Sequence, residues 1–120
     1  MTKTTKPWGY EELIFNTEAK LNIGYIPIAV KKFVLDGEEM TSYHVHKKVN
    51  EVLYVNRGMI EIRLENDVVS LNEGQAYFIE ANVPHQIQNI TSHTVEIIEF
   101  SFPFNGEDEK RIEDPYAKVR

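Results

Sequence analysis

The sequence predicts an all-β protein, and two features of the chain indicate it. Over most of its length apolar residues alternate with polar ones, which is the period of a half-buried strand rather than of a helix. Polar turns interrupt these segments about every 8–12 residues, a spacing typical of sandwiches and barrels. No stretch before Asn105 has the pattern of an amphipathic helix. The sequence therefore predicts many short strands joined by turns.

The alternation also locates the strands. We expect them at 25–35, 51–56, 59–65, 68–71, 76–79 and 94–104, with a further strand that carries His85. The segments 51–56 and 59–65 are predicted to form a hairpin around Arg57-Gly58, because Gly suits the turn. Eight or more strands in about 100 residues favour a closed double sheet of the jelly-roll type, since closure removes exposed edges.

A chain of 120 residues is long enough for one domain with a core and too short for two. No repeat, low-complexity tract or linker divides it, so residues 1–120 are predicted to form a single domain. We expect the barrel at about residues 7–104, a polar N-terminal tail at 1–6 and a charged C-terminal arm at 105–120. The arm is expected to be a surface segment or a short helical turn.

Composition excludes several classes of function. The net charge of −6 argues against binding to nucleic acid or to an anionic membrane. The absence of cysteine excludes disulfides, thiolate metal sites and cysteine nucleophiles. No segment resembles a signal peptide or approaches the ~20 apolar residues of a membrane span, so we expect a cytoplasmic protein.

Three histidines and one glutamate have spacings that a β-barrel could focus onto one metal ion. His44 and His46 lie two residues apart, so a strand would place both side chains on the same face. Glu51 follows five residues later, and His85 lies far downstream, whereas His93 falls in a turn and is assigned to the surface. Imidazole and carboxylate ligands suit divalent Zn, Mn, Fe, Ni or Co. On an octahedral ion they leave positions open for substrate, which indicates function rather than scaffolding.

The same residues resemble the two sequence motifs of the cupin superfamily. The first motif is matched by Gly37, His44, His46, Glu51 and Gly58, and the second by Gly74, Pro84, His85 and Asn89. Glu80 and Asn82 stand where Pro and Gly are usual, although Asn tolerates a positive φ better than most residues. The resemblance implies a jelly-roll barrel with its metal near one mouth. It also implies a homodimer, which exposed residues such as Tyr54 or Phe100 could form.

Both ends of the chain resemble the cupin domain of bacterial mannose-6-phosphate isomerases. Lys6–Leu13 contains the Pro-Trp-Gly that opens that domain, and Arg111–Tyr116 resembles its Arg-x-Glu-Asp-x-Tyr close. Ser42, Lys47 and Val52 stand where Gln, Arg and Trp are usual, and Lys cannot clamp a phosphate with two parallel hydrogen bonds as Arg can. The resemblance implies a metal-dependent isomerase of a sugar or sugar phosphate.

Such an isomerase moves a proton between C1 and C2 through an enediol, while a divalent ion stabilises the developing negative charge. Glu99, Glu80 and an unligated His85 are the candidate bases. Trp8 or Tyr43 could stack on a sugar, although Trp8 is explained equally well as an apolar plug. The candidate phosphate anchors are Lys31, Lys32, Lys47 and Arg63.

Two other functions stay open at this point. The same ligands could hold Fe(II) for a dioxygenase, or the barrel could bind a sugar without turnover. Metal identity and oxygen uptake would separate oxidation from isomerisation, and tight ligand retention without turnover would indicate a binding module. In each case the partner is a small molecule, because no basic helix for nucleic acid is present.

Overall fold

The computed structural model describes residues 2–17, 26–103 and 109–116. Within these ranges the chain forms eleven strands and no helix, so the all-β prediction is confirmed. None of the described residues forms a helix with the length and apolar character that a membrane span requires. The strands are β1 (Thr2–Lys6), β2 (Gly9–Asn16), β3 (Ala29–Leu35), β4 (Tyr43–His46), β5 (Asn50–Arg57), β6 (Met59–Arg63), β7 (Val68–Asn72), β8 (Ala76–Ile79), β9 (Gln86–Gln88), β10 (Val95–Phe102) and β11 (Glu109–Glu113).

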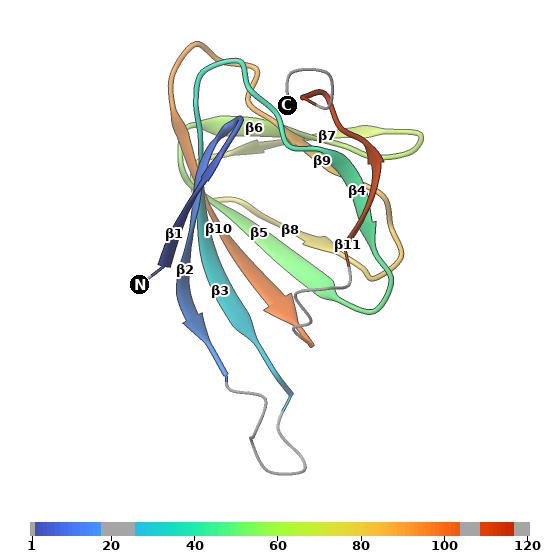
Figure 1. Cartoon of the computed structure of the whole chain (residues 1–120). Coiled ribbons are helices and arrows are strands. Elements are labelled where there is room, and N and C mark those ends of the chain that lie inside the picture. Colours follow the sequence, from blue (N-terminus) through green and yellow to red (C-terminus); the bar gives the residue numbers. More distant parts are fainter. Residues whose placement is uncertain (1, 18–25, 104–108, 117–120) are drawn as a thin grey trace.

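These strands build three antiparallel sheets. One has six strands in the order β1-β2-β3-β10-β5-β8, one has three in the order β7-β6-β9, and β11 pairs with β4. Figure 1 shows the six-stranded sheet as one wall of the molecule, with β6, β7 and β9 across the interior from it and β4 with β11 along one side. The arrangement is the jelly-roll barrel that the strand count predicts.

The predicted hairpin between 51–56 and 59–65 is wrong. β5 pairs with β10 and β8, whereas β6 pairs with β7 and β9, so the two consecutive strands lie in opposite sheets. Gly58 lies between them with φ at 89°, and a Cβ there would come within 2.7 Å of Val95 Cγ1. The alternation of apolar and polar residues fits both strands, because each strand points its apolar side chains into the same core from one of two opposite sheets.

The segment expected as an N-terminal tail is a strand over most of its length. Residues 2–6 form β1, which pairs with β2 in a register that places Lys6 opposite Gly9. The strand expected from Tyr25 begins at Ala29; residues 26–28 are not in a strand, and Tyr25 lies outside the described residues.

The C-terminal arm is also partly a strand rather than a free segment or helical turn. Glu109–Glu113 forms β11 along the edge of β4, and residues 105–108 and 117–120 of the predicted arm lie outside the described residues. Pairing with β11 satisfies backbone groups that β4 would otherwise expose at an edge.

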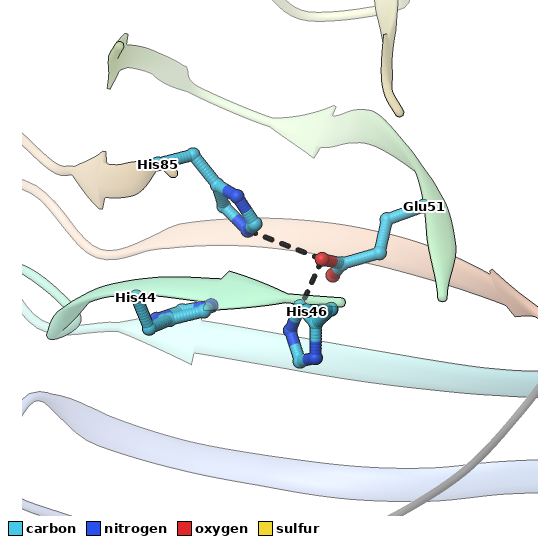
Figure 2. A group of neighbouring side chains, drawn as sticks. All are labelled: His44, His46, Glu51 and His85. Atoms are coloured by element: carbon cyan, nitrogen blue, oxygen red, sulfur yellow. Dashed lines mark ion pairs between the residues drawn. The ribbon is translucent and has the colours of Figure 1, made fainter. Parts of the chain in front are cut away.

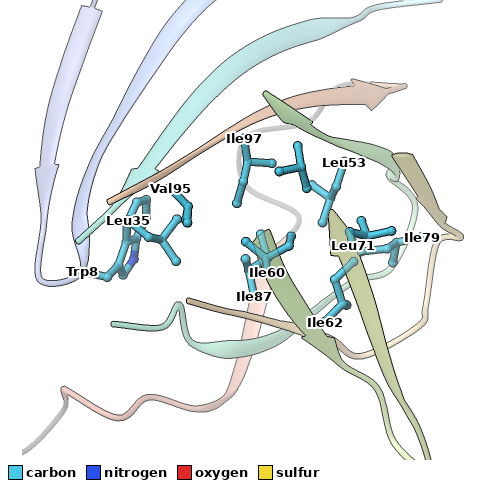
Figure 3. Packing of buried hydrophobic residues seen from close by; sticks show 11 residues of the cluster. Trp8, Leu35, Leu53, Ile60, Ile62, Leu71, Ile79, Ile87, Val95 and Ile97 are labelled. Carbon is cyan, nitrogen blue, oxygen red and sulfur yellow. The ribbon is translucent and has the colours of Figure 1, made fainter. Parts of the chain in front are cut away.

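The apolar core fills one half of the barrel and leaves the other half polar. Trp8, Leu35, Leu53, Val55, Ile60, Ile62, Leu71, Ile79, Ile87, Val95 and Ile97 form one buried cluster (Figure 3). On the inner face of β10, Val95 and Ile97 belong to this core, but Glu99 and Ser101 follow on the same face. The change from apolar to polar along the strand marks where the site lies.

Candidate metal centre

The structure brings all four expected metal ligands together in the polar half of the barrel. His44 and His46 come from β4, Glu51 from β5 and His85 from the segment before β9. Each offers one ligand atom, and these atoms all lie within 4.8 Å of one another. Figure 2 shows Glu51 directed at two of the imidazoles: its Oε1 lies 3.2 Å from His46 Nε2 and 3.1 Å from His85 Nε2.

Backbone contacts hold the ligand-bearing segments in place. His44 and His85 form an isolated antiparallel bridge, in which each backbone N–H donates to the other carbonyl, at 2.9 and 2.8 Å. Asn82 has φ at 70°, the left-handed conformation anticipated for it, and its N–H donates to the carbonyl of His46. The second histidine segment is therefore fastened to β4 on both sides of the cluster.

Hydrogen bonds at Nδ1 fix the orientation of two of the imidazole rings. His44 Nδ1 lies 2.9 Å from the carbonyl of Ser42, and His85 Nδ1 lies 2.9 Å from the carbonyl of Val83. A carbonyl only accepts, so Nδ1 carries the proton in both rings and Nε2 keeps its lone pair. Burial lowers the pKa of His44 to about 3, with the neighbouring His85 adding to the effect, and burial also lowers the pKa of His85. Both rings are thus neutral near pH 7, as metal coordination requires.

The donor atoms fit a divalent metal ion. Glu51 is only 2% exposed, and no group in the described part of the chain donates a hydrogen bond to its Oε1. That oxygen instead faces the lone pair of His85 Nε2, which leaves two acceptors in contact without a proton between them. A cation at this position would satisfy both, and three nitrogens with one oxygen are ligands that first-row divalent ions accept.

A second carboxyl, Glu99, supports Glu51 from β10. Glu99 is buried and donates a hydrogen bond to the Glu51 carboxylate, while Ser101 Oγ donates to Glu99 Oε1 at 2.9 Å. Burial raises the pKa of Glu99 well above its ordinary value, and the nearby negative charge of Glu51 raises it further. Of the two candidate bases with carboxyl groups, Glu99 lies beside the cluster, whereas Glu80 is exposed on the surface.

The cluster opens into a cavity of about 100 Å³ with mixed polar and aromatic walls. Trp8 is both part of the core and part of this wall, where it meets Phe33 edge-on with ring centres 5.7 Å apart. The lining residues are Lys6, Trp8, Glu11, Lys31, Phe33, Thr41, Ser42, His44, His46, Ile87, Glu99, Glu109, Arg111 and Tyr116.

Of the four phosphate anchors considered from the sequence, one lines the cavity. Lys31 is in its wall, and its Nζ lies 3.5 Å from Glu11. Lys32 pairs with Glu12 at 3.4 Å, and Arg63 pairs with Glu113 at 3.1 Å. Neither of these two, nor the exposed Lys47, belongs to the cavity lining.

Sequence reasoning did not identify the contribution of β11 to the site. Its Glu109 places Oε1 3.9 Å from His44 Nε2, and Arg111 Nε holds the other oxygen of that carboxylate at 3.3 Å. Tyr116 anchors the end of this segment, because its hydroxyl donates to Glu39 and accepts the N–H of Met40. The signal in the sequence was the terminal motif Arg111–Tyr116, which alone does not reveal that β11 pairs with β4.

Comparison with known proteins places these features in a family. The structure is similar to KdgF from a Halomonas species (TM-score 0.70, 17% identity, 89% of this chain and 90% of that one). It is also similar to an RmlC-like cupin from Shewanella frigidimarina (TM-score 0.66, 19% identity, 82% and 78%). Oxalate decarboxylase from Bacillus subtilis gives a TM-score of 0.77 at 18% identity over 92% of this chain, which spans only 30% of that protein.

At such identities these similarities show the fold alone. A search of curated protein sequences found no match. The sequence profile of the cupin domain, however, matches residues 32–101, which is more than half of the chain and includes all four clustered residues. The chain therefore belongs to the cupin domain family.

Proposed function

We propose that this protein is a metal-dependent cupin enzyme that isomerises a sugar or a sugar phosphate. His44, His46, Glu51 and His85 are the metal ligands in this proposal. The observation that carries it is the position of Glu99, a buried carboxyl in the cavity wall beside the ligand cluster, where burial raises its pKa. A carboxyl that can give and take a proton, placed next to a Lewis acid, is the pair of groups that such an isomerisation needs.

The chain's own residues account for the proton transfer. A bound divalent ion would supply electrostatic stabilisation of negative charge on the substrate oxygens. Glu99 gives its proton to the carbonyl oxygen of the substrate, and the carboxylate that remains takes the proton from the neighbouring carbon, so that the enediol forms with Glu99 protonated again; the same two transfers in reverse, at the other carbon, give the product. Glu51, which accepts the Glu99 hydrogen bond, holds the carboxyl in one orientation. Burial raises the pKa of Glu99 well above its ordinary value, which favours the protonated carboxyl that begins this sequence.

The cavity walls support a polyhydroxylated substrate. Thr41 and Ser42 provide hydroxyls, and the aromatic wall at Trp8 offers a flat apolar surface. Lys6 and Lys31 both pair with Glu11, at 2.9 and 3.5 Å, which places two cationic side chains in the cavity wall. Cationic side chains in the wall suit a substrate that carries an anionic group such as phosphate.

The proposal is tested by proton exchange as well as by turnover. Protein loaded in turn with Zn, Mn, Co, Ni or Fe(II) is incubated in D₂O with mannose 6-phosphate, fructose 6-phosphate and the corresponding free sugars. We expect deuterium to enter at C1 or C2 of one of these substrates and the aldose and ketose to interconvert, as followed by NMR.

The result that would overturn the proposal is the absence of both exchange and interconversion for every metal and sugar. Oxygen uptake with the Fe(II)-loaded protein would instead favour oxidation. Tight retention of a sugar without exchange would favour a binding role. The Glu80→Gln variant serves as a matched control, because Glu80 is exposed and should not affect exchange.

A further inference from the structure

The C-terminal strand β11 places a carboxylate in the cavity wall beside the metal cluster. β11 runs along β4 (Figure 1) in a register that sets Glu109 opposite His46 and Arg111 opposite His44. Cross-strand partners share a face of the sheet, so both β11 side chains point to the same side as the two histidine ligands. Glu109 and Arg111 accordingly line the cavity.

Arg111 holds one oxygen of Glu109 and leaves the other directed at the cluster. Its Nε donates to Glu109 Oε2 at 3.3 Å, and its Nη1 donates to Asp114 Oδ2 at 3.1 Å, so the guanidinium is held on two sides. Glu109 Oε1 lies 3.9 Å from His44 Nε2. Because Nδ1 of His44 carries the proton, its Nε2 presents a lone pair to this oxygen. Two acceptors therefore face each other, as they do at Glu51 and His85.

The distances around the cluster are compatible with one shared ion. Metal bonds to nitrogen and oxygen are ~2.1 Å long, so neighbouring ligand atoms on an octahedral ion lie ~3.0 Å apart and opposite ones ~4.2 Å apart. Glu51 Oε1 has the spacing of a neighbour to His46 and His85, at 3.2 and 3.1 Å. The 3.9 Å between Glu109 and His44 falls between the two values. Glu109 is not one of the four residues whose ligand atoms all lie within 4.8 Å of one another, so it reaches the ion by an inward shift.

Charge balance also favours a second carboxylate ligand. Three neutral imidazoles and one carboxylate leave one net positive charge of a divalent ion uncompensated, where Glu51 is 2% and His85 1% exposed. Charges buried to this degree are paired in proteins. Of the carboxyl groups in the cavity wall, Glu11 pairs with two lysines and Glu99 is hydrogen-bonded to Glu51. Glu109 is the one that faces a ligand nitrogen.

The contacts that β11 makes leave room for the ion to hold it more firmly. The strand pairs with β4 alone. At its far end Arg63 donates to the Glu113 carboxylate at 3.1 and 3.3 Å, and Tyr116 follows that end of the strand. Glu109 is the first residue of β11, at the opposite end. A metal bond there would fasten the strand at both ends.

We propose that Glu109 is a fifth ligand of the metal ion and that ion binding thereby fastens β11 to β4. The inference builds on the four-residue cluster and is independent of the reaction. Five ligands on an octahedral ion leave one position for a substrate oxygen. Because coupling between two equilibria is reciprocal, the ion stabilises β11 and β11 raises the affinity for the ion.

The test combines hydrogen exchange with zinc titration by calorimetry. In the wild type we expect zinc to slow amide exchange in β11 by at least about tenfold, while β1, which also pairs with one neighbour but carries no ligand, changes less. In Glu109→Gln the effect of zinc on β11 should fall to its effect on β1. The dissociation constant for zinc should rise at least the ~10-fold that loss of a supporting partner already costs.

Glu113→Gln is the matched control. It removes the same charge from the same strand, Gln still accepts a hydrogen bond from Arg63, and Glu113 does not line the cavity. Its dissociation constant for zinc should stay within about threefold of the wild type, since an exposed ion pair contributes little.

The proposal would be overturned if zinc left β11 exchange unchanged in the wild type, or if Glu109→Gln bound zinc within about threefold of the wild type. Equal losses of affinity in Glu109→Gln and Glu113→Gln would also overturn it, because the effect would then be one of charge alone. If Glu109→Gln does not fold, Glu109→Asp takes its place. Asp keeps the charge and shortens the side chain by one methylene, so weaker zinc binding would support ligation and unchanged binding would contradict it.

Discussion

Replacing Glu99 by Gln separates the two roles that its position supports. Gln keeps the shape and can still donate an N–H to Glu51, but it cannot release a proton. If Glu99 is the acid–base group, kcat should fall about 10²–10⁴-fold, the usual contribution of a positioned general acid or base. That loss corresponds to about 3–5 kcal/mol of transition-state stabilisation. Metal affinity should change less than about tenfold, because a hydrogen bond to Glu51 survives.

The comparison with Glu99→Ala completes the test. Ala removes the hydrogen bond as well, so the dissociation constant for the metal should rise by the ~10–100-fold that losing a ligand's supporting partner costs. Titration with Zn or Co followed by calorimetry gives the affinity, and deuterium exchange gives the chemistry. A Glu99→Gln variant that exchanges within about threefold of the wild type would refute the acid–base role. Glu80→Gln should change neither quantity, since Glu80 is exposed.

Three further predictions concern pH, packing and the C-terminal strand. Burial lowers the pKa of His44 to about 3 in the folded chain, below its ordinary 6.5, so unfolded chains take up its proton first as the pH falls. For metal-free protein, we therefore expect the free energy of unfolding, measured by urea titration, to keep its full value above about pH 6.5 and to be about 3 kcal/mol lower at pH 4. An equal free energy of unfolding at the two pH values would contradict this. Gly58→Ala should lower the free energy of unfolding by about 1–3 kcal/mol, because φ is 89° and the new Cβ would lie 2.7 Å from Val95 Cγ1; an unshifted urea midpoint would refute it. Tyr116→Phe removes the hydrogen bonds to Glu39 and Met40 and should lower the free energy of unfolding by about 1 kcal/mol. In this variant the backbone amides of β11 should exchange faster than those of β10, and equal protection of the two strands would argue against the anchor.

Much of the site could be predicted because its determinants are local. Alternation along a strand determines that His44 and His46 share a face whatever the strand pairs with. Alternation in the structure also distinguishes the two candidate carboxyl groups. Glu99 lies two residues from the inward-facing Ile97 and so faces inward, whereas Glu80 directly follows the inward-facing Ile79 and so faces outward. The sequence alone would not have chosen Glu99, because Ile98, Phe100 and Phe102 make the other face of the same strand at least as apolar.

Partners in the sheets could not be predicted in this way. Alternation shows which side chains face the core, but it is equally satisfied whether β5 and β6 form a hairpin or lie in opposite walls. The pairing of β11 with β4 joins segments more than 60 residues apart in the sequence, so no local pattern places Glu109 beside His44. Strand pairing over such separations depends on the closed barrel as a whole.

The central claim is that four side chains from separate segments hold one divalent ion. The most direct measurement is the metal content of purified protein, by mass spectrometry, for the wild type and for the double variant His44→Ala, His46→Ala. We expect one ion per chain in the wild type and almost none in the double variant, with the barrel intact by circular dichroism. Equal metal content in the two proteins, or a wild type that retains no ion after dialysis against any of the candidate metals, would contradict the account.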